Sequence, residues 1–240
     1  MFADMPFLDH LEEMRRRLLV VLAVFCLVSV AALFLSGTVV RFLTDVLLRQ
    51  GSTLIAVKPA EKFLAYLKIA MASGAVAAFP VLAAETALFV LPALGSMARK
   101  MLVPAVVSAI FLGLLGCVFS LFALVPFAFG FFAGFARGDG IENFWSFGSC
   151  VDLSLSLLFA SALAFQFPWL LAAAMNLGIL DVRTLEKFRR HVIVFIFIVA
   201  AVITPPDIFS QSVVALSLWV LFELTVLAGK LSAATKGGPE

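Results

Sequence analysis

Acidic and basic side chains are sparse in this sequence, and one dense group of them lies close to its N-terminus. The group consists of Glu12, Glu13, Arg15, Arg16 and Arg17. If this segment is helical, each glutamate faces the arginine four residues later, because residues four apart share a helix face. One interpretation is an interfacial helix held by its own salt bridges. The other is a site for a basic ligand, because a planar guanidinium is bound best by a carboxylate.

The other informative polar residues interrupt long apolar stretches. Glu85 and Gln166 each stand within such a stretch, and Arg99 and Lys100 lie between two of them. A charged or amide side chain inside the hydrocarbon is costly and usually faces a partner or a wet cavity, so Glu85 and Gln166 are candidate docking positions. A further polar block contains Thr204, Pro205, Pro206, Asp207 and Gln211. Within it, Asp207 can cap the helix that follows, and capping is compatible with partner binding.

Catalytic constellations are not evident in the sequence. It contains no H-E-x-x-H zinc motif, no G-x-S-x-G elbow, no P-loop and no dinucleotide fingerprint, and His10 and His191 are far apart with no cysteine cluster near either. We therefore expect a protein that is not an enzyme and that holds no metal or cofactor. The net charge of +2 also argues against a nucleic-acid surface.

Composition assigns the whole chain to the membrane. Of its 240 residues, 63% are apolar and only 13% are charged, whereas a soluble domain has about 25% charged residues. A soluble fold is excluded, and uncharged stretches recur along nearly the whole length. We expect an all-α polytopic membrane protein with one integral membrane domain over residues 1–240. The basic N-terminal start imitates a signal peptide, but the uncharged run of residues 18–40 is longer than a signal peptide's apolar region, so we expect a retained first helix.

The uncharged stretches predict six membrane-spanning helices. We place them at residues 18–35, 63–90, 102–125, 151–177, 188–203 and 208–222, with an interfacial helix at 39–48 in the first outer loop. Pro80 predicts a kink in the second helix, and Pro126 ends the third. The fifth and sixth helices hold only about 15 residues, or about 23 Å each. A hairpin this short should thin the bilayer locally.

The basic residues predict the orientation of the chain. With six spans, eleven of the seventeen lysines and arginines fall in the loops and ends on one side of the membrane. The positive-inside rule makes that side cytoplasmic, so both termini are expected in the cytoplasm.

Several sequence blocks occur together in the order and spacing of one known family. They are His10 to Leu18 (HLEEMRRRL), Pro59 to Phe63 (PAEKF), Phe79 to Leu82 (FPVL), Leu91 to Leu94 (LPAL), Phe165 to Pro168 (FQFP) and Ile203 to Gln211 (ITPPDIFSQ). On these blocks the chain resembles TatC, the multispanning subunit of the twin-arginine protein translocase, over nearly its whole length. The resemblance implies a glove-shaped bundle of six helices in the inner membrane, with cytoplasmic termini. It also implies export of folded proteins driven by the proton gradient.

The resemblance also implies where ligands bind. In the family, acidic groups of the N-terminal helix and of the first cytoplasmic loop recognise the two arginines of a signal peptide. Glu13 matches the first of these groups, but Ala98 stands where the family has the loop glutamate. We expect the signal-peptide site to comprise Glu13, Glu12, Arg15, Arg17, Arg99 and Lys100.

Partner docking is the second implication of the resemblance. Gln166 stands where the family often has a glutamate, and Glu85 stands where a neutral residue is more usual, so the acidic group is expected to have moved. These two residues and the block Thr204 to Gln211 are expected to contact single-span subunits of the TatA and TatB type in a hetero-oligomer.

Two alternatives remain at the level of sequence. A secondary transporter of a small solute would use Glu85 and Gln166 as its midplane site and would show paired broken helices in its two halves. A purely structural scaffold would require that none of the cytoplasmic charges matters. A receptor instead concentrates ligand-binding charge at the cytoplasmic rim.

Overall fold

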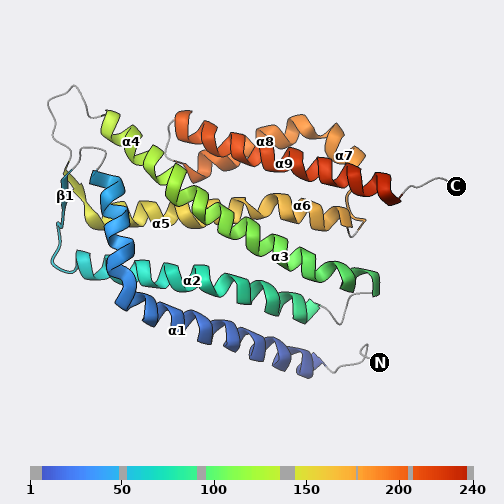
Figure 1. The fold of residues 1–240 in the computed structure, drawn as a ribbon, viewed down its shortest axis with the longest axis horizontal. Helices are drawn as coiled ribbons and strands as arrows, with labels where there is room; N and C mark the ends of the chain where they lie inside the picture. The colour runs from blue at the N-terminus through green and yellow to red at the C-terminus, as the bar shows by residue number, and fades with distance from the viewer. Residues whose placement is uncertain are drawn as a thin grey trace. The chain divides into compact units, whose positions relative to one another are not determined.

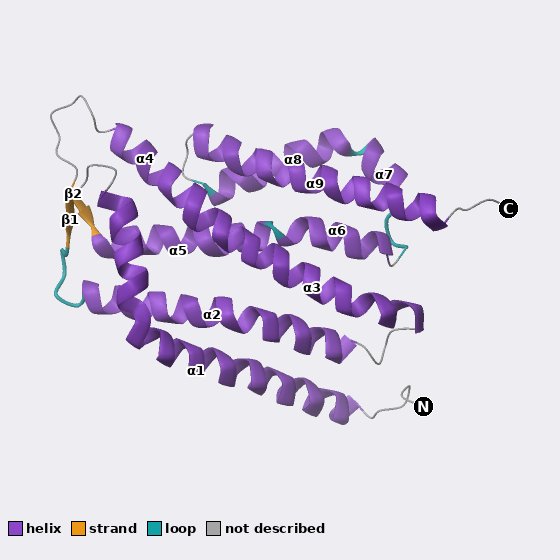
Figure 2. Ribbon diagram, viewed as in Figure 1, coloured by secondary structure: helices purple, strands orange, loops and turns teal. Residues whose placement is uncertain are grey.

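The computed structural model describes residues 7–48, 53–90, 96–135, 144–176, 178–204 and 208–236. Helices make up nearly all of these residues, as Figure 1 and Figure 2 show. In chain order the elements are α1 (Phe7–Leu48), β1 (Thr53–Ile55), α2 (Glu61–Val90), α3 (Ser96–Phe119), a π-helical turn (Ser120–Leu124), α4 (Val125–Phe135), β2 (Phe144–Ser146), α5 (Phe147–Ala164), α6 (Gln166–Asn176), α7 (Val182–Lys187), α8 (Arg189–Ile203) and α9 (Ile208–Lys236).

The described residues belong to two compact units. The first unit lies within Met1–Ile110 and Ala136–Leu155, and so holds α1, α2, both short strands and the first parts of α3 and α5. The second unit lies within Phe111–Phe135 and Ser156–Glu240, and so holds α4 and α6 to α9 with the remaining parts of α3 and α5.

Five helical segments of the described chain are long and apolar enough to cross a membrane. They are Leu11–Leu48, Glu61–Phe89, Leu102–Gly134, Phe147–Asn176 and Gln211–Leu231. The polytopic helical class is therefore confirmed. The fifth predicted span corresponds to α8, whose 15 residues rise about 23 Å. The six-span count and the orientation stay predictions.

The core of the first unit forms where α1, α2 and α5 meet. The apolar side chains buried there are Val40, Leu43, Ala65, Ile69, Phe147 and Val151. Beside them β1 pairs with β2 in parallel, so that the segment before α2 is joined to the segment before α5. Figure 1 shows α1 and α2 running side by side as an antiparallel pair.

A glycine permits the close approach of α1 and α2. A Cβ placed on Gly74 of α2 would lie 2.0 Å from the Ser29 hydroxyl oxygen and 2.9 Å from the Phe25 carbonyl oxygen, both on α1. A hydroxyl can rotate away, but a backbone carbonyl cannot. Only glycine at this position therefore allows the present spacing of the two helices.

The first helix is longer than the sequence predicts. We expected a span at 18–35 and a separate interfacial helix at 39–48, but α1 is continuous from Phe7 to Leu48 and bends in its later part (Figure 1). Ser36 donates a hydrogen bond to the Leu33 carbonyl at 2.6 Å, which satisfies its hydroxyl within the helix. Beyond it, the buried side chains of Val40, Leu43 and Leu47 lie on one face, and their packing sustains the helix through Gly37.

The prediction that Pro126 ends the third helix is wrong. A π-helical turn over Ser120–Leu124 joins α3 to α4, and the N–H of Val125 bonds to the Ser120 carbonyl five residues earlier. A proline lacks its own donor and clashes with the carbonyl four residues before it. The wider π turn accommodates this proline, and the helix continues to Phe135.

The last helix is also longer than predicted. We expected it to end at residue 222, where an apolar run meets Glu223, but α9 has 29 residues and reaches Lys236. Its charges have partners in the second unit: Glu223 pairs with Arg189, and Lys230 pairs with Glu186. Paired charges need not end an apolar helix, so of the two short helices that we predicted only α8 is short.

The fourth predicted span is broken near its middle. Phe165 separates α5 from α6, and Pro168 is buried in the first turn of α6. The missing donor and the ring of Pro168 disfavour a continuous helix here, while proline is accepted in a first turn.

In the second unit, Gly116 of α3 lets α5 approach, and Ser161 donates to the Gly116 carbonyl at 3.0 Å.

Replacement of Gly74 by alanine tests the packing of α1 on α2. We expect Gly74→Ala to destabilise the chain by about 1–3 kcal/mol, because the new methyl group meets the Phe25 carbonyl. The measurement is thermal unfolding of the purified chain in detergent. The matched control is Gly134→Ala, since a Cβ on Gly134 meets nothing within 4 Å. Equal unfolding temperatures for the two variants would contradict the close approach.

Candidate functional site

A charged cluster joins α1 to α2 in the first unit. The Arg17 guanidinium donates through Nη2 and Nε to Glu13 Oε1, at 2.6 and 3.1 Å, and through Nη1 to Glu85 Oε2 at 2.8 Å. The exposed fractions of these side chains are 24% for Arg17, 28% for Glu13 and 22% for Glu85. One guanidinium is thus held by two carboxylates from different helices, and all three side chains are partly accessible.

Helix geometry explains why these residues meet. Glu13 and Arg17 are four residues apart on α1, so their pairing is local and confirms one of the two predicted salt bridges. Glu85 is brought to Arg17 by the antiparallel pairing of α1 and α2. The contact near Gly74 belongs to the same pairing and lies about three turns along α2 from Glu85.

The other residues of the predicted signal-peptide site form no described contact with the cluster of Glu13, Arg17 and Glu85. Glu12, Arg15 and Arg16 are exposed on α1, and no ion pair between Glu12 and Arg16 forms among the described residues. Arg99 and Lys100 lie in the first turns of α3, but their side chains are outside the described part of the structure.

The predicted partner-docking residues lie in the second unit, apart from Glu85. Gln166 is the first residue of α6, directly after the break at Phe165. Thr204 donates to the Ala200 carbonyl at 2.8 Å, and the Gln211 amide donates to the Phe197 carbonyl at 3.3 Å, which links α9 to α8. Pro205, Pro206 and Asp207 lie outside the described residues, so the predicted cap by Asp207 is untested.

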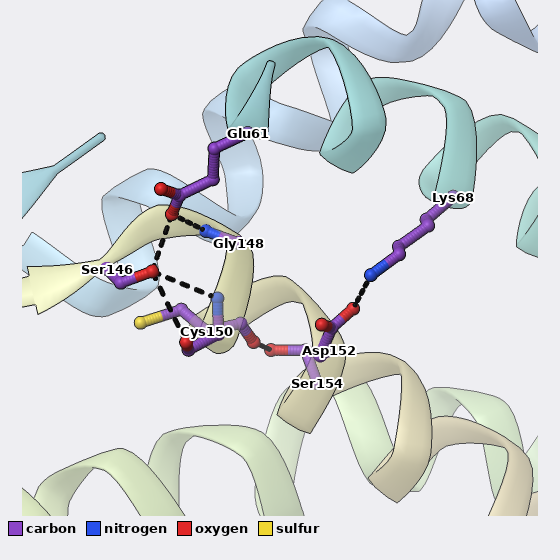
Figure 3. Close-up of polar contacts among 8 residues, drawn as sticks. Glu61, Lys68, Ser146, Gly148, Cys150, Asp152 and Ser154 are labelled. Atoms are coloured by element: carbon purple, nitrogen blue, oxygen red, sulfur yellow. Dashed lines mark hydrogen bonds and ion pairs between the residues drawn. The ribbon is translucent and has the colours of Figure 1, made fainter. Parts of the chain in front are cut away.

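A second polar site in the first unit, absent from the sequence analysis, is centred on Glu61. Its carboxylate accepts hydrogen bonds from the amides of Val57 and Lys58, at 2.7 and 3.1 Å. It also accepts one from the Ser146 hydroxyl at 2.5 Å and one from the Gly148 amide at 2.6 Å (Figure 3). This carboxylate ties the segment before α2 to the start of α5. The signal that could have indicated this site is an acidic residue two positions before the predicted helix of residues 63–90, because a carboxylate near a helix N-terminus is favourable.

The site around Glu61 has an ion pair beside it. Lys68 of α2 contacts Asp152 of α5 at 2.5 Å, with about half of each side chain exposed (Figure 3). An exposed pair of this kind contributes about 0–1 kcal/mol. Glu61 and Glu85 lie 24 residues apart on α2, so the two polar sites are about 36 Å apart along this helix.

Ion pairs also join the helices of the second unit. Arg189 of α8 donates to Glu223 of α9 at 2.9 Å, and Lys230 of α9 contacts Glu186 of α7. The hydrogen bond from Lys230 holds the pKa of the Glu186 carboxyl below its ordinary value. In the described part of the chain, His, Cys, Asp and Glu side chains form no group of three that could hold a metal ion.

The fold and these sites define a polytopic helical membrane protein in which charged side chains pair between helices. The family described as Sec-independent protein translocase protein (TatC) matches residues 9–216. The chain therefore belongs to the TatC family.

Individual relatives agree with this assignment. The Sec-independent protein translocase protein TatC of Azotobacter chroococcum is 34% identical over 229 residues, which cover 94% of this chain and 89% of that protein. The TatC of Escherichia coli K12 is 32% identical over 231 residues, covering 92% and 86%. A crystal structure described as the twin-arginine translocase receptor TatC matches with a TM-score of 0.77 at 28% identity, covering 92% of this chain and 99% of that chain.

Loss of the Glu61 carboxylate should loosen the segments that it joins. We expect Glu61→Gln to speed hydrogen exchange at the amides of Val57, Lys58 and Gly148 by about tenfold or more, because an amide presents only one acceptor oxygen to these donors. The measurement is hydrogen exchange of the purified chain. The control is Asp152→Asn, which should leave these amides unchanged, and equal protection in both variants would contradict the joining role.

Proposed function

We propose that this chain is the receptor subunit of a twin-arginine translocase. It binds Arg-Arg signal peptides at its cytoplasmic face, assembles with single-span TatA- and TatB-type subunits, and supports export of folded proteins driven by the proton-motive force. The observation that carries the proposal is the cluster of Glu13, Arg17 and Glu85, in which two carboxylates bind a guanidinium at one end of the first unit. Membership of the TatC family supports it.

The proposal includes a placement in the membrane. The chain is a single integral domain of the inner membrane, with six spans and both termini in the cytoplasm. The excess of basic residues in the predicted inside loops supports this orientation. Glu12, Arg15, Arg99 and Lys100 then lie with Glu13 and Arg17 at the cytoplasmic rim, where a signal peptide arrives.

Partner docking is assigned to the second unit. Gln166 offers an amide at a helix break, which suits a hydrogen bond to the polar end of a single-span helix. The block from Thr204 to Gln211 is the edge that such a helix contacts. The bonds from Thr204 and Gln211 to the α8 backbone brace this edge.

The transporter alternative requires Glu85 to serve a midplane solute site together with Gln166. Glu85 is instead engaged by Arg17, which also holds Glu13. This engagement favours a receptor for a basic peptide.

Removal of the Glu13 charge tests the proposal. We expect Glu13→Gln to weaken binding of an Arg-Arg signal peptide by tenfold or more, because a charge-assisted contact contributes about 1.5–3 kcal/mol. The measurement is fluorescence anisotropy of a labelled peptide titrated with the full chain in lipid nanodiscs. Asp152→Asn serves as the control carboxylate change and should bind normally. Unaltered binding by Glu13→Gln would leave Glu13 as a helix salt-bridge partner only.

The short α8 yields a separate prediction about transport. Its 15 residues rise about 23 Å, less than the roughly 30 Å of a hydrocarbon core, so the bilayer beside it should be thinned. Lengthening α8 by one apolar turn, with Thr204 to Gln211 kept intact, should preserve signal-peptide binding and impair transport. Crosslinking of the turn to the single-span partner verifies assembly. Normal transport by the assembled variant would refute the thinning.

A further inference from the structure

The Arg17 guanidinium occupies a binding site built from two helices. Glu13 of α1 and Glu85 of α2, which we call the carboxylate clamp, bind it from two sides at 2.6 and 2.8 Å. Arg17 uses both Nε and Nη2 on Glu13 and keeps Nη1 for Glu85. Such a two-sided arrangement suits a planar guanidinium, whose donors point in several directions within one plane.

The carboxylate clamp has binding capacity beyond Arg17. Two carboxylates face one guanidinium, so the group carries one excess negative charge. In the described part of the chain, Glu13 Oε2 and Glu85 Oε1 take part in no hydrogen bond. Both side chains are more than one-fifth exposed, so a cation can reach them from outside.

We propose that the carboxylate clamp is the site for an arginine of the signal peptide, and that Arg17 occupies it until the incoming arginine displaces it. Glu85 thereby becomes a signal-peptide-binding residue, in place of the partner-docking role that we expected from the sequence. The inference rests on the proposed function and adds to it the second carboxylate and an internal competitor. Glu85 also supplies a second carboxylate acceptor in a chain that has Ala98 in place of the loop glutamate.

Exchange of one guanidinium for another explains a preference for arginine over lysine. An incoming arginine reproduces the contacts that Arg17 gives up, so both carboxylates stay paired. A lysine ammonium is a compact point charge without the planar fork, and it cannot reproduce contacts to two carboxylates in one plane. The released Arg17, already about one-quarter exposed, turns to water.

Two substitutions with opposite expected effects test the clamp. Glu85→Gln should weaken Arg-Arg peptide binding about tenfold and reduce the preference over a Lys-Lys peptide, because one charged acceptor is lost. Arg17→Gln should tighten Arg-Arg binding several-fold, because the internal competitor is gone. The measurement is the Kd of both peptides for the full chain in nanodiscs. Asp152→Asn is the control and should match the wild-type chain.

The outcomes separate this inference from the proposed function. If the wild-type chain does not prefer Arg-Arg over Lys-Lys, the proposed function fails. If the wild-type chain prefers Arg-Arg, and Glu85→Gln has the same Kd and the same preference, Glu85 is not part of the peptide site. The clamp assignment then fails and the receptor function stands. Weaker binding of the Arg-Arg peptide by Arg17→Gln would overturn the proposal that the incoming arginine displaces Arg17. If Glu85→Gln folds poorly, Glu85→Asp is the second variant, because it keeps the charge. It should retain the preference for the Arg-Arg peptide and bind it with weaker affinity. Loss of that preference in Glu85→Asp would overturn the clamp.

Discussion

The close antiparallel pairing of α1 and α2 is the contact on which the candidate site depends. Gly74 lets the α2 backbone approach Phe25 and Ser29 of α1. At one end of the pair, the register brings Glu85 to Arg17. At the other end, the buried side chains of both helices pack against α5 near the Glu61 carboxylate. A change of spacing near the middle of this pair would therefore disturb both polar sites of the first unit.

Pairing of charges explains how an apolar chain keeps its ionic groups. An isolated charge in hydrocarbon is costly, and pairing within the protein reduces that cost. Arg17 is paired with two carboxylates, and Arg189 and Lys230 each have one acidic partner in the second unit. The first group differs from the others because it has one carboxylate in excess. That excess distinguishes the cluster from the balanced pairs, which join helices, and it underlies the proposal that the cluster accepts a ligand.

Much of the fold could be predicted because long uncharged runs define membrane helices, as α2 illustrates with bounds within two residues of the prediction. The errors arose where packing, an ion pair or an unusual backbone turn overrides a local signal. Burial of Leu43 and Leu47 stabilises α1 beyond Gly37, and the ion pair with Arg189 of α8 allows α9 to continue through Glu223. The π-helical turn accommodates Pro126, so the third helix does not end there. The Glu13–Arg17 pair was predictable from spacing alone. The contact of Arg17 with Glu85 was not, because it joins residues 68 apart and depends on the helix register.

The position of a bound signal peptide relative to the two helices tests the central claim most directly. A photoreactive residue is placed beside the arginine pair of the peptide, and the crosslinked positions on the full chain are mapped by mass spectrometry. We expect crosslinks both in α1 around Glu13 and in the last turns of α2 around Glu85, and their loss when excess Arg-Arg peptide competes. Crosslinks confined to α1, or located only in the second unit, would contradict a site shared by the two helices.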